Sequence, residues 1–366
     1  MNAVRDPYPQ LEVDLGKLKE NLTALRERCQ DSFVEVFGVV KGVNAWEPVV
    51  RVFDDMGFPY LATSRVDQLK QMRDMGVRTP LLLIRIPMLS ELSDVVALAD
   101  ASLQSDLTVI RATNEEAKRQ GKRHKVMLMI DLGDLREGFW SAEELVDAAV
   151  EIEHDMPSLE LIGVGVNLSC YGSIKPDKRN MQGLVSLSLD VERAIGRKLQ
   201  WVSGGATTSM QMVLNGTMPY RVNNLRVGEM MLLGHEYTFN PGFTQDGVFT
   251  LRAEVVECRD KPSFPVGQLA LDAFGREGHY EDRGIRRRAI IALGRVDYGD
   301  CCDLKPRLPG VEVLGQSSDH TILDVEAVKD SIHVGDILEF DVNYASLVFL
   351  TGSAGVHLTV KKDEPV

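Results

Sequence analysis

The sequence predicts a (β/α)8 barrel of the TIM type followed by a smaller β domain, because the pattern of the chain changes near residue 235. Before that point, apolar runs alternate with amphipathic segments in eight strand–helix repeats with short polar connections. Eight such repeats fit a closed parallel barrel better than an open doubly wound sheet, which the pattern alone leaves as an alternative. After that point, Gly and Pro clusters separate short strand-like runs without a long helix, which is typical of a β domain.

The predicted barrel strands are short apolar runs, each followed by a segment of helical character. The strands cover residues 11–15, 34–40, 60–63, 80–85, 101–103, 125–131, 161–168 and 199–202. The helical segments cover 17–29, 46–55, 65–75, 90–98, 107–120, 142–154, 181–196 and 207–214. The later strands cover 249–258, 289–293, 311–314, 320–325, 337–342 and 356–360. We therefore predict the barrel over 9–234 and the β domain over 235–366, which residues 1–8 could join.

The composition is that of an ordinary globular protein, with 44% hydrophobic and 26% charged residues among 366. A net charge of −13 argues against nucleic acid or an anionic membrane as a partner. The first ten residues are polar and lack a signal pattern, and no apolar run reaches the ~18 residues of a membrane span. Five scattered cysteines show neither a disulfide framework nor a metal site. We expect a reduced, cytoplasmic protein without a metal.

Lys41 follows a nearly continuous apolar run, residues 34–40, at the expected carboxyl end of a buried parallel strand. α/β folds place their chemistry at such strand ends. A buried amine has a lowered pKa and attacks carbonyl groups, so Lys41 is a candidate Schiff-base nucleophile. The alternative interpretation is a strand-end lysine that points into water.

Two other predicted strand ends carry polar side chains. Arg136 lies in the loop 131–138, and its fixed charge suits a carboxylate or a phenolic oxygen. Asn167 begins a polar and aromatic cluster, residues 167–172, that either contacts a ring or forms an ordinary turn. Both residues are also compatible with solvated loops.

The eighth predicted strand ends in Ser203, Gly204 and Gly205. Small residues let backbone N–H groups approach an anion at the start of a helix, and this is a common phosphate position in barrels. The hydroxyl groups of Ser203, Thr207 and Thr208 offer further donors. Ser and Gly also form plain caps and turns, which is the alternative.

Arg226 ends a short strand-like run in the segment 224–229, just before Gly228 and Glu229. From such a position, its side chain could point back into the barrel mouth. A guanidinium group only donates hydrogen bonds, so a pyridine nitrogen facing Arg226 would stay unprotonated. A surface arginine before a turn glycine is the alternative.

The order of these features resembles the alanine racemase family, which uses pyridoxal 5'-phosphate (PLP). The order is a strand-end lysine, a strand-end arginine, a Ser-Gly-Gly turn, an Arg-x-Gly segment and a β domain. The resemblance implies that Lys41 holds PLP covalently and acts as one of two acid–base groups. The other cofactor-binding residues that it implies are Arg136, Asn167, Ser203, Gly204, Gly205, Arg226, Gly228, Glu229 and Tyr344.

Finer motifs resemble the ornithine racemase branch of this family, in residues 131–138, 166–172, 272–275, 280–286 and 317–320. The resemblance implies a homodimer with shared active sites and a substrate that is ornithine or a related basic amino acid. It places Arg136, Ser318 and Asp319 at the substrate. Acidic residues that suit a δ-ammonium group are Asp272, Glu281, Asp282 and Asp319.

One departure from the family leaves the second acid–base group open. The family's catalytic tyrosine has Phe274 as its nearest counterpart, and phenylalanine cannot move a proton. Asp272 and Tyr280 are the catalytic candidates, with Asp319 as a third. Two other functions stay open, which are a PLP-dependent lyase or aldolase on the same scaffold and a non-catalytic PLP carrier.

Overall fold

The computed structural model describes residues 7–272 and 274–362. The chain divides into two units, here called the barrel unit and the β unit. The barrel unit runs from Gly16 to Asp246, and the β unit combines the segment up to Leu15 with the chain from Gly247 onwards. Within the described residues, no helix has both the length and the apolar character needed to span a membrane.

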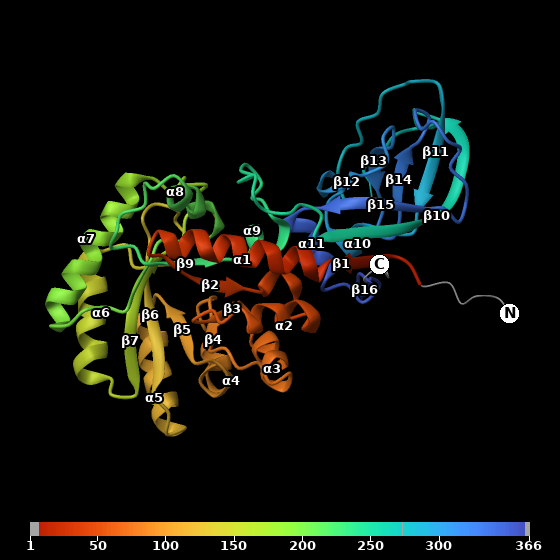
Figure 1. The fold of residues 1–366 in the computed structure, drawn as a ribbon. Coiled ribbons are helices and arrows are strands. Elements are labelled where there is room, and N and C mark those ends of the chain that lie inside the picture. Colours follow the sequence, from red (N-terminus) through yellow and green to blue (C-terminus); the bar gives the residue numbers. More distant parts are fainter. Residues whose placement is uncertain (1–6, 273, 363–366) are drawn as a thin grey trace. The chain divides into compact units, whose positions relative to one another are not determined.

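The barrel unit contains a closed parallel barrel of eight strands with helices outside it (Figure 1). The strands are β2 (Glu35–Val39), β3 (Leu61–Thr63), β4 (Leu81–Leu83), β5 (Ala101–Gln104), β6 (His124–Ile130), β7 (Leu159–Val166), β8 (Trp201–Ser203) and β9 (Asn224–Val227). The helices are α1 (Leu15–Asp31), α2 (Glu47–Asp55), α3 (Val66–Asp74), α4 (Leu92–Leu98), α5 (Leu107–Arg119), α6 (Ala142–Asp155), α7 (Lys178–Ile195), α8 (Met210–Leu214) and α9 (Glu229–Leu233). The fold class predicted for this part is confirmed.

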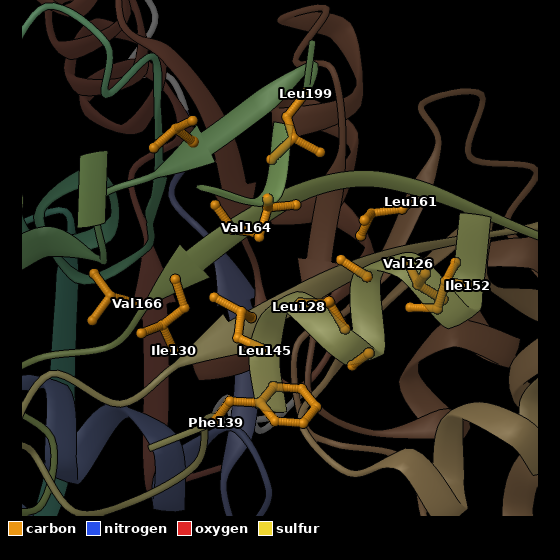
Figure 2. Close-up of a cluster of buried hydrophobic side chains, with 14 of the residues drawn as sticks. Val126, Leu128, Ile130, Phe139, Leu145, Ile152, Leu161, Val164, Val166 and Leu199 are labelled. Carbon is orange, nitrogen blue, oxygen red and sulfur yellow. The ribbon is translucent and has the colours of Figure 1, made fainter. Parts of the chain in front are cut away.

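Alternate residues of the strands face the inside and the outside of the barrel, as the period of two requires, and apolar cores form on both sides. One core consists almost entirely of strand residues, and in it Phe37 packs edge-on against Tyr60 and Trp201. Gly163 lets β7 lie close to the backbone of β8, because a Cβ there would lie 2.4 Å from the Trp201 carbonyl oxygen. An outer core joins β6 and β7 to α6 and α7, and Figure 2 shows Leu128 and Leu145 among its side chains.

The first strand of the chain does not belong to the barrel, so its prediction as the first barrel strand, residues 11–15, is wrong. Strand β1 (Gln10–Val13) pairs antiparallel with β10 (Phe249–Pro262) and parallel with β16 (His357–Val360). The barrel closes through β9 instead, which pairs with both β2 and β8. A short apolar run predicts a strand but does not say which sheet accepts it.

The β unit is built on an eight-stranded sheet around the long strand β10, which pairs with β1, β11 and β15. Its other strands are β11 (Ile285–Ile291), β12 (Leu304–Pro306), β13 (Glu312–Gln316), β14 (Thr321–Asp324) and β15 (Ile337–Val342). Two short helices, α10 (Arg295–Tyr298) and α11 (Tyr344–Leu350), complete the described part of this unit. The predicted β domain is thereby confirmed as an antiparallel sheet domain.

Candidate active site

Lys41 begins a 3-10 turn, Lys41–Val43, directly after β2 at the carboxyl end of the barrel. The residue as a whole is exposed, yet the protein around its amine displaces enough water to lower the pKa of Lys41. The charges of Arg136 and Arg226 lower this pKa further, while Cys170 and Glu137 oppose the shift. The amine is therefore a stronger nucleophile at neutral pH than a lysine in water.

The loops around Lys41 contain most of the strained backbone of the described chain. All non-glycine residues with positive φ except Phe33 lie in loops after β2, β6 or β7, and they are Asn44, Ala45, Leu135, Ser169 and Ser173. Each such conformation costs on the order of 1–3 kcal/mol and persists only where neighbouring contacts hold it. Asp131 holds Leu135 in this way, since its Oδ1 accepts the N–H of Leu135 at 3.1 Å. Concentrated strain of this kind marks the barrel mouth as the functional end.

Arg226 is buried at the end of β9, with only 3% of its surface exposed. Its Nη2 donates to the Val166 carbonyl at 2.7 Å and to Asn167 Oδ1 at 2.6 Å, and its Nη1 donates to Ser203 Oγ. Burial lowers the pKa of Arg226 to about 10, which the charge of Glu137 opposes, so the group remains charged at neutral pH. The predicted inward orientation of this side chain agrees with these contacts.

Ser203 holds Arg226 and does not offer a free donor. Its hydroxyl donates to Asn224 Oδ1 at 2.5 Å while it accepts from Arg226. The Asn224 amide in turn donates to the Glu35 carbonyl at 3.1 Å, which ties β9 to β2. The pattern of residues indicated Ser203 as a phosphate donor, but a hydroxyl group has one hydrogen, and here it is used within the protein.

The turn after β8 has the features of an anion cradle. A Cβ at Gly204 would lie 2.6 Å from Val222 Cγ1, and one at Gly205, where φ is +108°, would lie 2.8 Å from Ser209 Oγ. The 3-10 turn that follows, Thr207–Ser209, has no side-chain cap at its start. Thr208 Oγ1 is buried without a hydrogen-bond partner among the described residues. An orphaned hydroxyl beside uncapped N–H groups fits the phosphate group of PLP.

Gly228 and Glu229 follow Arg226 closely. A Cβ at Gly228 would lie 2.9 Å from the Val39 carbonyl, so only glycine lets β9 pass so near to β2. Glu229 begins α9, and burial, aided by the charge of Glu236, raises the pKa of its carboxyl group to about 7. Gly228 therefore lies next to the strand that precedes Lys41, and Glu229 follows it as a largely desolvated carboxyl group.

The candidates of the β unit are exposed and bound to their own loop. Asp272 Oδ1 accepts the N–H groups of Phe274 and Arg276, both at 2.8 Å. These bonds, with that of the Arg276 backbone strongest, lower the pKa of Asp272. Tyr280 is half exposed, and its ring packs edge-on against Phe264 at 6.2 Å. Asp272 and Tyr280 line one cleft of about 570 Å³ within this unit.

Ser318 and Asp319 do not line this cleft. They lie between β13 and β14, where the Ser318 carbonyl accepts the N–H of Val296 at 3.1 Å. A Cβ at Gly294 would lie 2.1 Å from the Ser318 carbonyl oxygen, so this turn packs against backbone. Tyr344 is the first residue of α11. The structure thus places Asp272 and Tyr280 in one cleft, whereas Ser318 and Asp319 lie outside that cleft.

Phe274, the counterpart of the family tyrosine, lies beneath two guanidinium groups. The Arg295 guanidinium is 4.4 Å and that of Arg276 is 5.6 Å from the ring centroid, which are cation–π distances. Ala273, the residue directly before Phe274, lies outside the described residues. Phe274 therefore serves as a platform for cations, which is a role that needs no ionisable group.

Asp300, Cys301 and Cys302 place one potential metal ligand each within 4.8 Å of one another. Burial, with the charge of Asp300, raises the pKa of the Cys301 thiol. A thiol must lose its proton to bind a metal, so this environment works against a metal site. The prediction of no metal remains a prediction.

Sequence reasoning missed Glu137. Its Oε2 lies 2.9 Å from Nε of Arg136, and its Oε1 accepts a hydrogen bond from Nδ2 of Asn167. An acidic residue directly after a candidate arginine was the available signal. It was overlooked because carboxylates in loops are usually solvated, whereas only 14% of this side chain is exposed.

Residues 13–236 match the family model "Alanine racemase, N-terminal domain". The chain is 40% identical over 344 residues to the ornithine racemase of Acetoanaerobium sticklandii, covering 93% of this chain and 96% of that protein. It is 36% identical over 343 residues to the lysine racemase of Thermotoga maritima, covering 93% and 95%.

Solved structures share the fold at low identity. An alanine racemase of Clostridium difficile 630 has a TM-score of 0.75 at 17% identity, covering 98% of this chain and 97% of that one. A D-threonine aldolase of Filomicrobium marinum has a TM-score of 0.70 at 15% identity, covering 94% and 89%. The fold alone therefore does not distinguish a racemase from an aldolase, whereas the sequence relatives do. On the family model and the two near full-length relatives, the chain belongs to the alanine racemase family of amino-acid racemases.

Proposed function

We propose that this protein uses PLP to interconvert the L and D forms of ornithine or a related basic amino acid. The observation that carries the proposal is the barrel mouth, where Lys41 has a lowered pKa within the electrostatic influence of the buried Arg226. The ornithine and lysine racemases, at 40% and 36% identity, support the choice of a basic substrate.

The mouth offers the groups that PLP requires. Lys41 would hold the cofactor covalently, and the Gly204–Gly205 turn with Thr208 would receive its phosphate. Arg226 would face the pyridine nitrogen, and Arg136 would face the phenolic oxygen. The remaining proposed contacts are Asn167, Ser203 through Arg226, Gly228, Glu229 and Tyr344. When bound, PLP supplies the electron sink for the charge that develops at Cα.

Lys41 is suited to move the α-proton on one face of the substrate. Its lowered pKa leaves more of the amine unprotonated near neutral pH, which is the form that accepts a proton. Arg226 keeps its charge and only donates, so it holds a ring nitrogen opposite it in the unprotonated form.

Inversion at Cα requires a second proton donor on the opposite face. Tyr280 fits this role better than Asp272, because the Asp272 carboxylate is already occupied by N–H donors that lower its pKa. A phenol carries the proton that must be delivered, and half of Tyr280 is accessible. We assign Asp272 the role of ordering this loop, and keep Asp319 and Ser318 as substrate contacts.

The side chain of a basic substrate finds an acidic environment in the β unit. The cleft with Tyr280 is lined by five carboxylates and three guanidinium groups, which are Asp272, Glu277, Glu281, Glu312 and Asp324 against Arg276, Arg283 and Arg288. Arg286, outside this lining, pairs with Asp324, and the excess of negative charge that remains suits a terminal ammonium group. We further propose a cytoplasmic homodimer in which one subunit's β unit completes the site of the other.

The function is tested by incubating the PLP-loaded protein with a panel of L-amino acids in D₂O. Deuterium at Cα together with loss of optical rotation is expected for ornithine or lysine. Release of an aldehyde or CO₂ would instead support a lyase. A loaded protein that exchanges no α-proton would be a carrier. Borohydride reduction and peptide mapping should place the cofactor on Lys41, and a label elsewhere would refute its role.

A further inference from the structure

Glu137 joins the two arginines of the mouth. Its carboxylate lies 2.9 Å from Nε of Arg136 and accepts a hydrogen bond from the Asn167 amide. Asn167 accepts a hydrogen bond from Arg226 at 2.6 Å through the other end of that amide. A single carboxylate therefore holds Arg136 directly and Arg226 through one side chain, across the loops that follow β6 and β7 and the end of β9.

The Asn167 amide has one favourable orientation in this bridge. The Arg226 guanidinium only donates, so it requires the amide oxygen, and the Glu137 carboxylate only accepts, so it requires the amide NH₂. A flipped amide would set donor against donor and acceptor against acceptor. One of the three hydrogen bonds that hold Arg226 thus depends on an acceptor at residue 137.

Glu137 is also the carboxylate that balances the charge of the mouth. The charged and titratable groups that act on Lys41 are Cys170, Arg136, Glu137 and Arg226. Asp134 is nearby and buried, but its carboxylate accepts the backbone N–H groups of Cys170, Tyr171 and Ile174. Since 14% of the Glu137 side chain is exposed, solvent screens its charge only weakly.

We infer that Glu137 is a positioning residue, which fixes the two arginines that face the cofactor and supplies the negative charge between them. The inference rests on the proposed function, because it takes Arg136 and Arg226 as contacts of PLP. Glu137 acts through Arg136 and Asn167, the two side chains that its carboxylate contacts.

The test is Glu137→Gln, which keeps the shape and an acceptor oxygen but removes the charge. We expect kcat/KM for the basic amino acid to fall roughly 10- to 100-fold, the effect of losing a hydrogen bond between charged groups. The visible absorption of the PLP-loaded protein should titrate at lower pH than in the wild type, because protonated groups near residue 137 lose their counter-charge. Glu137→Asp, which keeps the charge, should titrate close to the pH of the wild type.

The matched control is Glu151→Gln, which also removes a carboxylate paired with an arginine of the barrel unit. Glu151 lies 2.6 Å from Nε of Arg111, on the outer helices α6 and α5. It should leave kcat/KM and the absorption titration unchanged. Circular dichroism of all variants separates these effects from a loss of fold.

A double-mutant cycle with Asn167→Ala tests the bridge itself. If Glu137 acts on Arg226 through Asn167, the losses of activity in the two single variants should add up to more than the loss in the double variant. Fully additive effects, or a Glu137→Gln protein with the wild-type titration and kcat/KM, would overturn the inference while leaving the racemase intact. A wild-type protein that neither binds PLP nor racemises a basic amino acid would instead overturn the proposed function, and the inference with it.

Discussion

The barrel unit and the β unit hold their candidate residues in opposite ways. In the barrel, Arg226 and Ser203 are almost completely buried and bonded to each other across two strands. In the β unit, Asp272 and Tyr280 lie on an exposed segment between β10 and β11, and Asp272 is bonded to residues two and four positions away. The barrel thus orders its candidate residues through contacts between strands, while the candidates of the β unit depend on contacts within their own loop.

The difference follows from how each unit fixes its backbone. The carboxyl ends of eight parallel strands meet at one mouth, so side chains distant in sequence converge there without further ordering. A loop carries its residues where its own turns place them. The barrel candidates should therefore tolerate little change, and the loop candidates should show smaller and separable effects.

The largest effect should come from Lys41→Ala. Removing both the covalent attachment and the proton acceptor should lower racemisation by about 10⁴-fold. The measurement is the rate of optical rotation loss, with PLP attachment followed by mass spectrometry. Lys70→Ala, an exposed lysine paired with Asp74 at 2.5 Å on α3, is the control and should behave as the wild type. Substantial racemisation by the Lys41 variant would remove the barrel mouth from the mechanism.

Tyr280→Phe tests the catalytic role proposed for the β unit. It should lower kcat by about 10²-fold, because only the phenolic proton is lost while the ring stays against Phe264. Exchange of the α-proton in D₂O should persist on the Lys41 face, so exchange without inversion is the expected signature. Tyr237→Phe, 83% exposed in the barrel unit, is the matched control. Equal losses of exchange and inversion would assign the second proton to another residue.

The two units should also respond differently to acid. His124 is buried at the start of β6 with its Nε2 3.0 Å from Ser102 Oγ, and burial lowers its pKa from 6.5 to about 4. The unfolded chain takes up this proton first, so the stability of the barrel should fall by up to about 3 kcal/mol between pH 6.5 and 4, and not further below. His124→Asn should flatten this dependence.

Fluorescence isolates the barrel in that experiment, because the three tryptophans of the chain, Trp46, Trp140 and Trp201, all lie within Gly16–Asp246. Urea unfolding is followed by fluorescence at a series of pH values. An unchanged slope of stability against pH in the His124 variant would show that another group controls the acid response.

The smallest effect should come from the β unit's buried ion pair. A carboxylate oxygen of Asp324 lies 2.8 Å from Nε of Arg286. Burial alone would raise the pKa of Asp324, but the hydrogen bonds from Arg286 outweigh it, so the pKa is lowered. The ion pair therefore stabilises the folded β unit fully above pH 3.8, the ordinary pKa of an aspartate. This stabilisation is lost as the pH falls through the lowered pKa of Asp324. Asp324→Asn should cost about 1–2 kcal/mol at neutral pH, seen by circular dichroism. A matching loss in tryptophan fluorescence would mean that the units do not unfold separately.

Sequence patterns predicted most of the barrel because its strands are apolar runs covered on both faces. They assigned residues 11–15 to the wrong sheet, since the β unit accepts β1 between β10 and β16. They found Arg226 through its place before Gly228, but they missed Glu137, whose carboxylate contacts the neighbouring Arg136 and also Asn167 in the loop after β7. They predicted the Ser203 hydroxyl as a donor to a phosphate, whereas in the structure it donates to Asn224 Oδ1.

The sequence by itself determined the order of the chemical groups, from Lys41 to Arg226, and with that order the family. Strand-end positions follow from local periodicity, so this information is contained in short windows of the chain. Only the tertiary structure decided which groups share hydrogen bonds, such as Glu137 with Asn167 and Ser203 with Asn224. The pairing of neighbouring barrel strands creates those contacts, because it brings together residues that are 21 to 30 positions apart.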